Sequence, residues 1–136
     1  MRMVFDTNVI ISTLVFTSSH TRLLRQNWAA ARLIPVVSKS TVEELLAVLS
    51  YAKFKLSIES RDLLLAEYLT HAEVCGHVKS FKSKYPCSDL NDQMFIDLAL
   101  SSDVVALVSG DADIQSMQAT FPMPIYTLSE LSSHMV

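Results

Sequence analysis

The sequence predicts an α/β domain in which a parallel sheet of four to five strands carries helices on both faces. Three observations lead to this prediction. The chain has 136 residues and is 50% hydrophobic, which suffices for one core and is too apolar for a disordered chain. Short apolar runs alternate with longer stretches of helical periodicity. No repeat or linker divides the sequence, so we expect one domain over residues 1–136.

The first predicted elements are a strand and a helix. The strand is a short apolar run, residues 3–5, which ends at Asp6. Thr7 or Asn8 then has the side chain needed to cap a helix over residues 9–15.

A second helix and a second strand follow. Residues 20–32 have the periodicity of a helix with an apolar face and arginines on its outer side. The apolar run 34–37 predicts a buried strand with a proline near its start, where a missing amide is tolerated. Ser38 or Ser40 is suited to cap the next helix, over residues 41–49.

The rest of the chain continues the alternation. A serine opens a long helix over 57–73, and the polar stretch 77–87 indicates a weak strand and a loop. A helix over 89–100 precedes a β-branched strand at 104–108. The last elements are a helix over 112–118, a strand at 124–126 and a helix from Thr127 through Leu131.

Charge is distributed unevenly along the chain. The net charge of −3 by itself argues against a protein that binds nucleic acid through a basic coat. Residues 1–84 contain all 11 Lys and Arg with 7 acids, a balance of +4, whereas residues 85–136 contain 7 acids and no Lys or Arg. The second part therefore cannot neutralise its own carboxylates.

Acidic side chains follow two of the predicted strands. Asp6 comes directly after the first strand, and Asp111 and Asp113 follow the strand at 104–108 across Gly110. The carboxyl ends of parallel strands meet at one edge of a sheet, where ligands bind. We expect Gly110 to allow the tight turn that brings these carboxylates together.

A second pair of acids, Asp89 and Asp92, begins the helix that precedes this strand and can lie at the same edge. The helix dipole alone accounts for a carboxylate or two at a helix N-terminus. It is not expected to account for the acids at the strand ends.

Carboxylates packed this closely need a cation to stay ionised, because like charges a few Å apart raise one another's pKa. No Lys or Arg follows Lys84, so Mg²⁺ or Mn²⁺ is the simplest source of the positive charge. An ion held by carboxylates can bind a phosphate oxygen and activate a water. The pattern therefore predicts phosphoryl or phosphodiester hydrolysis.

Four motifs lie in order along the chain, and together they resemble the PIN domain. They are Asp6-Thr7-Asn8, Glu44-Leu45 with Val48-Leu49, Asp92-Gln93-Met94-Phe95-Ile96 with Leu98-Ala99, and Val108-Ser109-Gly110-Asp111-Ala112-Asp113. More narrowly, the chain resembles the bacterial PIN proteins of toxin–antitoxin pairs, relatives of the VapC-type ribonucleases. The resemblance spans essentially the whole sequence.

The resemblance implies a metal-dependent endoribonuclease that cuts single-stranded or loop RNA and has an antitoxin protein as partner. The family's four catalytic acids match Asp6, Glu44, Asp92 and Asp111, and the residues implied as metal ligands are Asp6, Asp92, Asp111 and Asp113. Asn8 matches the asparagine that orients the first aspartate, and Ser109 matches a residue that supports the pocket. Asp89 lies in a stretch that is often acidic in these relatives.

The periodicity of the helix at 41–49 leaves a choice between two glutamates. With about 100° per residue, Glu44 points nearly opposite the apolar face and Glu43 flanks it. That face consists of Val42, Leu45, Leu46 and Leu49. Periodicity thus favours Glu43, whereas the resemblance implies Glu44.

Other clusters have competing interpretations. His71, Cys75, His77 and Cys87 could form a zinc set, but their spacing matches no common zinc motif, and free thiols in a reducing cytoplasm are the expectation. Lys79, Lys82 and Lys84, with Arg22 and Arg25, would either contact RNA phosphates or form a solvated face.

The mean hydropathy of +0.31 predicts an apolar surface that is buried in a homo-oligomer or against a partner, with the helices at 9–15 and 57–73 as candidates. No apolar run is long enough to span a membrane.

Two alternatives to an enzyme remain at this stage. One is a receiver-like α/β module, which needs a lysine after a late strand, where this chain has none. The other is a PIN domain that binds partners without catalysis.

Overall fold

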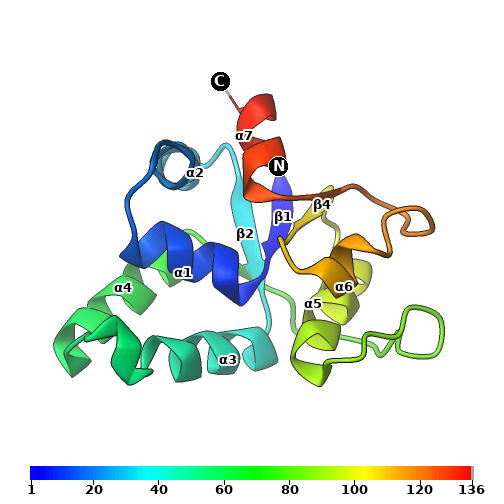
Figure 1. Cartoon of the computed structure of the whole chain (residues 1–136), viewed down its shortest axis with the longest axis horizontal. Coiled ribbons are helices and arrows are strands. Elements are labelled where there is room, and N and C mark those ends of the chain that lie inside the picture. Colours follow the sequence, from blue (N-terminus) through cyan, green and yellow to red (C-terminus); the bar gives the residue numbers. More distant parts are fainter. Residues whose placement is uncertain (136) are drawn as a thin grey trace.

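A five-stranded parallel sheet forms the centre of the molecule over the described part of the chain, residues 1–135 of the computed structural model (Figure 1). The strands lie in the order β3-β2-β1-β4-β5, and Val136 of the expected domain lies outside the described residues. Their bounds are β1 (Arg2–Phe5), β2 (Ile34–Val37), β3 (Glu73–Val74), β4 (Ala106–Val108) and β5 (Ile125–Tyr126). The predicted α/β class is confirmed.

Helices cover both faces of this sheet. Their bounds are α1 (Thr7–Val15), α2 (Ser19–Ala29), α3 (Lys39–Leu49), the 3₁₀ turn η1 (Ala52–Phe54), α4 (Ile58–Thr70), α5 (Leu90–Ser101), α6 (Ala112–Gln115) and α7 (Leu128–His134). The buried side chains of residues 1–135 form two clusters that follow the alternation of the strands. Met3 and Phe5 pack with α1 to α4 and α7, whereas Val4 packs with α5 and α6 on the opposite face.

The strand order excludes the receiver-like alternative. Receiver-like domains have the order 2-1-3-4-5, in which the first strand lies between the second and third. Here β1 lies between β2 and β4. Strands β2 and β3 are therefore added on one side of β1, and β4 and β5 are added on its other side. The carboxyl ends of β1 and β4 are therefore neighbours, with Phe5 opposite Val108 in the register.

Several predicted boundaries change. Asp6 caps α1, in place of Thr7 or Asn8, because its side chain accepts the Val9 amide. The helix expected over 57–73 ends at Thr70, so that the third strand forms at 73–74 and none forms within 77–87. The helix expected over 112–118 is a single turn, Ala112–Gln115. The short turn η1 was not predicted.

The aromatic centre of the larger cluster ties three elements together. Trp28 of α2 packs edge-on against Phe5 of β1 at 5.4 Å between ring centroids, and against Tyr68 of α4 at 5.1 Å. Trp28 is 2% exposed. Its ring therefore joins the sheet to both helices.

The two candidate oligomer surfaces differ in exposure. Val9, Ile10, Ile11 and Leu14 of α1 are buried within the domain, so α1 offers no apolar face to a second copy. On α4, Ile58 and Leu63 are 65% and 72% exposed, and this helix stays a candidate. Across residues 1–135, no helix combines the length and the apolar character needed to cross a bilayer.

We expect Trp28→Ala to lower the free energy of unfolding by about 3 to 5 kcal/mol, because it removes a buried ring and leaves a cavity beside β1. Urea denaturation followed by circular dichroism measures the change. Tryptophan fluorescence is not suitable, because Trp28 is the single tryptophan and the variant lacks it. The exposed Val105→Ala serves as control and should stay within about 0.5 kcal/mol of wild type. An equal effect of both changes would contradict a centre at Trp28.

Candidate metal centre

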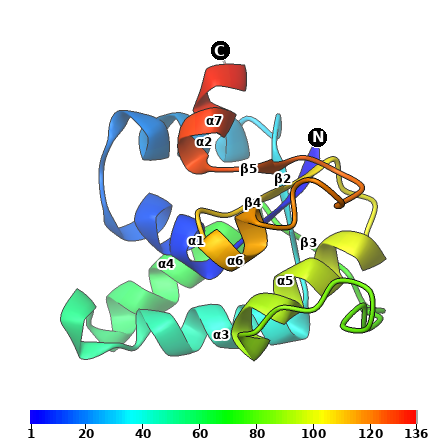
Figure 2. The same ribbon diagram turned by 45° about the vertical axis from the view of Figure 1, so that its right-hand side comes forward.

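An acidic cavity of about 200 Å³ opens at the carboxyl ends of β1 and β4. Figures 1 and 2 show α3, α5 and α6 gathered around one end of α1 at this edge of the sheet. Five of the six predicted acids line the cavity together with Asn8, and the exception is Asp113. The full lining consists of Asp6, Thr7, Asn8, Glu44, Val48, Asp89, Asn91, Asp92, Phe95 and Asp111.

Asp6 is fixed at the floor of this cavity. The Val9 amide donates to its Oδ1 at 2.9 Å, and the Ser109 hydroxyl donates to its Oδ2. The carboxylate is 5% exposed, and burial raises its pKa, although the hydrogen bonds from Ser109 and Val9 oppose the shift. The residues that orient Asp6 are thus Ser109 and Val9, while Asn8 lines the cavity mouth and is exposed.

The turn after β4 positions the next two acids. The Asp111 carboxylate accepts the amides of Asp113 at 2.9 Å and Ile114 at 3.1 Å, and so caps α6. The Ser109 hydroxyl accepts the Asp111 amide at 3.0 Å while donating to Asp6. One serine therefore links the ends of both strands, and capping explains Asp6 and Asp111 as well as chemistry does, contrary to the expectation from the sequence.

Gly110 does not have the expected role in this turn. No glycine among residues 1–135 has a positive φ, and a Cβ at position 110 would meet no atom within 4 Å. The turn is made by the Ser109 and Asp111 hydrogen bonds, which any residue at 110 would permit.

Asp92 completes a set of three carboxylates. One oxygen each from Asp92, Asp111 and Asp113 lies within 4.8 Å of the others. Burial, followed by the charges of Asp111 and Asp89, raises the pKa of Asp92 to about 6. The ionised form of this cluster is therefore costly without a cation.

The donors fit a hard divalent ion. All three clustered atoms are carboxylate oxygens, the ligand type that Mg²⁺ and Mn²⁺ prefer. Thr7 also lines the cavity, and its hydroxyl is buried with no hydrogen-bond partner within residues 1–135. A buried hydroxyl without a partner is unfavourable unless a ligand or its water shell supplies one.

Helix α3 separates the two competing glutamates. Glu44 lines the acidic cavity beside Val48, one turn later on the same helix. Glu43 lines a different, apolar groove and lies 4.0 Å from the ammonium of Lys39. Periodicity misled here because Leu46, counted with the buried face, is 38% exposed, and α3 buries the stripe through Leu45 and Leu49.

Three contributing residues were not singled out from the sequence. The Ser88 hydroxyl donates to the Asp113 carboxylate at 2.5 Å. The Gln93 side chain accepts the Cys87 amide at 2.8 Å and donates to the Tyr85 carbonyl, which fixes the loop that leads to Asp89. Thr7 carries the hydroxyl without a partner. Ser88 and Gln93 form hydrogen bonds with other segments of the chain, and such contacts cannot be predicted from the periodicity of the sequence.

The alternative clusters do not come together. Among residues 1–135, the histidines and cysteines form no group of three with metal-binding geometry, and both cysteines are free thiols. Lys79, Lys82 and Lys84 lie exposed on the loop before α5, whereas Arg25 pairs with Glu67 through two hydrogen bonds.

Comparisons with known proteins give a family and a fold. The family described as PIN domain matches residues 2–113. Among solved structures, a chain in the crystal structure of VapBC2 from Rickettsia felis bound to a DNA fragment from their promoter is similar, with a TM-score of 0.67 and 14% identity. That alignment covers 93% of this chain and 98% of the other. No curated protein matches in sequence.

We expect Asp92→Asn to stabilise the metal-free protein at neutral pH. The pKa of Asp92 is raised in the folded state, so the contribution of its protonated form to stability is complete below about pH 4 and is lost as the pH rises through about 6. The asparagine has no such proton, so the variant should melt about 3 °C above wild type at pH 7.5, a shift typical of 1 kcal/mol. The two proteins should agree near pH 4.

Thermal unfolding with chelator, at both pH values, measures this difference. Added Mg²⁺ should raise the melting temperature of wild type more than that of the variant, because ligand binding stabilises the folded state. A gap that is independent of pH would show that the Asp92 charge is not its cause.

Proposed function

The chain belongs to the PIN domain family, and from this premise we propose that it is a metal-dependent endoribonuclease, the toxin of a toxin–antitoxin pair. Members of the family are nucleases. The observation that carries the proposal is the meeting of Asp92, Asp111 and Asp113 within 4.8 Å. Two of them, Asp92 and Asp111, line the cavity together with Asp6 and Glu44. Hydrolysis of a phosphodiester bond is the chemistry that such a carboxylate set supports.

Asp92, Asp111 and Asp113 would hold a Mg²⁺ or Mn²⁺ ion. When bound, the ion supplies Lewis acidity at a phosphate oxygen and lowers the pKa of a water. Asp6 is held in one orientation toward the centre by its hydrogen bonds from Ser109 and Val9. The Asp111 carboxylate, which caps α6, is already held in one orientation, so little of its conformational freedom is lost when the substrate binds.

Glu44 has a separate task in this proposal. It enters the cavity from α3, and within residues 1–135 its carboxylate makes no hydrogen bond or ion pair. A carboxylate without other partners is available to accept the proton of an attacking water. Asn8 and Asp89, at the cavity wall, would contact the substrate or its water shell.

An antitoxin is the proposed protein partner. The similar structure from Rickettsia felis is described by its title as VapBC2 with promoter DNA, and the match extends over nearly the whole of both chains. Copurification with the product of a reading frame beside the gene would test this partner. A homo-oligomer is proposed through α4, whose Ile58 and Leu63 are exposed, and light scattering of the purified chain would test it.

We expect the purified protein to cut single-stranded RNA with Mg²⁺ or Mn²⁺ and to stop when a chelator is added. Asp6→Asn and Asp92→Asn should each lower the cleavage rate about 100-fold or more, because each removes a charge from the preorganised centre. The measurement is the initial rate on a labelled RNA.

Glu44→Gln and Glu43→Gln are a matched pair on one helix for the same assay. Glu44→Gln should lose activity, whereas Glu43→Gln, which lines the other groove, should keep it. Equal rates for wild type and Asp92→Asn would contradict the proposed centre. RNA binding without any cleavage would instead favour the non-catalytic PIN module.

A further inference from the structure

We propose that single-stranded RNA leaves the acidic cavity along α1, with one base stacked on the Phe16 ring, which Phe54 supports, and the adjoining phosphates contacted by Lys53 and Arg22. This inference rests on the proposed function and adds the path of the substrate beyond the cleaved bond. The four residues are called here the α1 track.

The first argument is that three hollows follow one another along α1. The acidic cavity shares Asn8 with a hollow of about 330 Å³, lined also by Ser12, Phe16, Lys53 and Phe54. That hollow shares Phe16 with a third, of about 200 Å³, which Arg22 and Arg25 line. The series follows the nine residues of α1 from its first turn to its end, about 13 Å.

The second argument is an exposed aromatic ledge in the middle of this series. The rings of Phe16 and Phe54 are 6.3 Å apart between centroids and inclined by 60°. Phe16 is 57% exposed, whereas Phe54 is partly buried against the core and supports it. Exposed aromatic rings beside a nuclease centre offer the sequence-independent stacking surface that single strands use.

The third argument is cationic charge that no acidic side chain neutralises. The Lys53 ammonium lies 5.2 Å from the centroid of the Phe54 ring. Within residues 1–135 neither Lys53 nor Arg22 forms an ion pair, whereas Arg25 is taken by Glu67. These cations flank the ledge on both sides, which is where the phosphates of a stacked nucleotide would lie.

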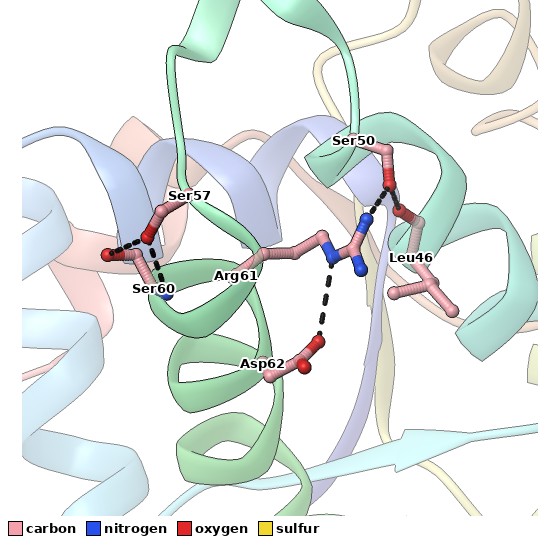
Figure 3. Close-up of polar contacts among 6 residues, drawn as sticks. All are labelled: Leu46, Ser50, Ser57, Ser60, Arg61 and Asp62. Carbon is pink, nitrogen blue, oxygen red and sulfur yellow. Dashed lines mark hydrogen bonds and ion pairs between the residues drawn. The ribbon is translucent and has the colours of Figure 1, made fainter.

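Side-chain hydrogen bonds hold both ends of the segment that carries Lys53 and Phe54. Figure 3 shows Arg61 of α4 reaching to Ser50 at the end of α3, where its Nη1 donates to the Ser50 hydroxyl at 2.8 Å. The same hydroxyl donates to the Leu46 carbonyl, and Ser57 caps α4 by accepting the Ser60 amide. Both ends of the connection 51–57 are therefore fixed.

Charge and position favour RNA over a protein partner as the occupant. The α1 track has one small ledge with free cations and joins the carboxylate centre directly. The groove lined by Val37, Val42, Leu69 and Val74 is more apolar and does not share a residue with the acidic cavity. A polyanion that must reach the centre is therefore the better match to the α1 track.

The test measures binding of a ten-nucleotide oligouridylate to the full chain with Asp92→Asn and Mg²⁺, so that the RNA stays intact. Phe16→Ala should raise the dissociation constant about tenfold, the loss typical of one stacked base. Phe16→Trp should restore binding. Lys53→Ala should weaken binding and reduce the slope of log K against log salt by about 0.7.

A fluorescent base locates the contact. With 2-aminopurine placed at one position at a time, quenching should be strongest at a single position and should disappear in Phe16→Ala. The controls Val105→Ala and Arg32→Ala, outside the α1 track, should bind as wild type. The circular dichroism spectra of Phe16→Ala and Lys53→Ala should match that of the parent, which would show that weaker binding is not a loss of fold.

The outcomes separate the two proposals. If the protein binds and cuts RNA but Phe16→Ala and Lys53→Ala bind as tightly as the parent, the α1 track is wrong and the ribonuclease stands. If the otherwise wild-type chain neither binds nor cuts RNA with Mg²⁺, the ribonuclease proposal fails and the track fails with it. If Phe16→Ala spares RNA binding but disrupts a copurifying protein, the ledge is a protein surface.

Discussion

The pairing of β1 with β4 is the constraint on which the site depends. With Phe5 opposite Val108, the Asp6 amide donates to the Val108 carbonyl at 3.0 Å, and Ser109 is placed to bind the Asp6 carboxylate. A slip of one residue would turn every side chain of β1 to the opposite face and separate these two groups. Because Val4 and Phe5 pack into different clusters, the core on both sides of the sheet enforces the register.

The carboxylates are held in a state that the protein alone does not favour. Burial raises the pKa of Asp6, and burial with two neighbouring charges raises that of Asp92 to about 6. At Asp6, the Ser109 hydroxyl and the Val9 amide at the start of α1 offset part of this cost. A divalent cation of the proposed kind would recover the remainder on binding, because its charge would favour the ionised carboxylates.

Much of this arrangement was predictable from local patterns. Short apolar runs gave the central strands, and the position of Asp6 and Asp111 just after two of them placed the acids at one edge. What local patterns could not supply were contacts between distant segments: the Ser88 bond to Asp113, the Gln93 support of the loop, and the true buried stripe of α3. That stripe depends on which neighbours α3 meets, and a helical wheel contains no such information.

The double duty of Asp6 and Asp111 has an evolutionary consequence. Each accepts backbone amides at a helix start while presenting charge to the cavity. Asparagine can accept the same amide bonds through its carbonyl oxygen, but carries no charge. At Asp111, one nucleotide change can therefore remove the charge while the cap of α6 stays, whereas at Asp6 it would also remove the oxygen that accepts the Ser109 hydroxyl. Loss of the Asp111 charge therefore does not require loss of the fold.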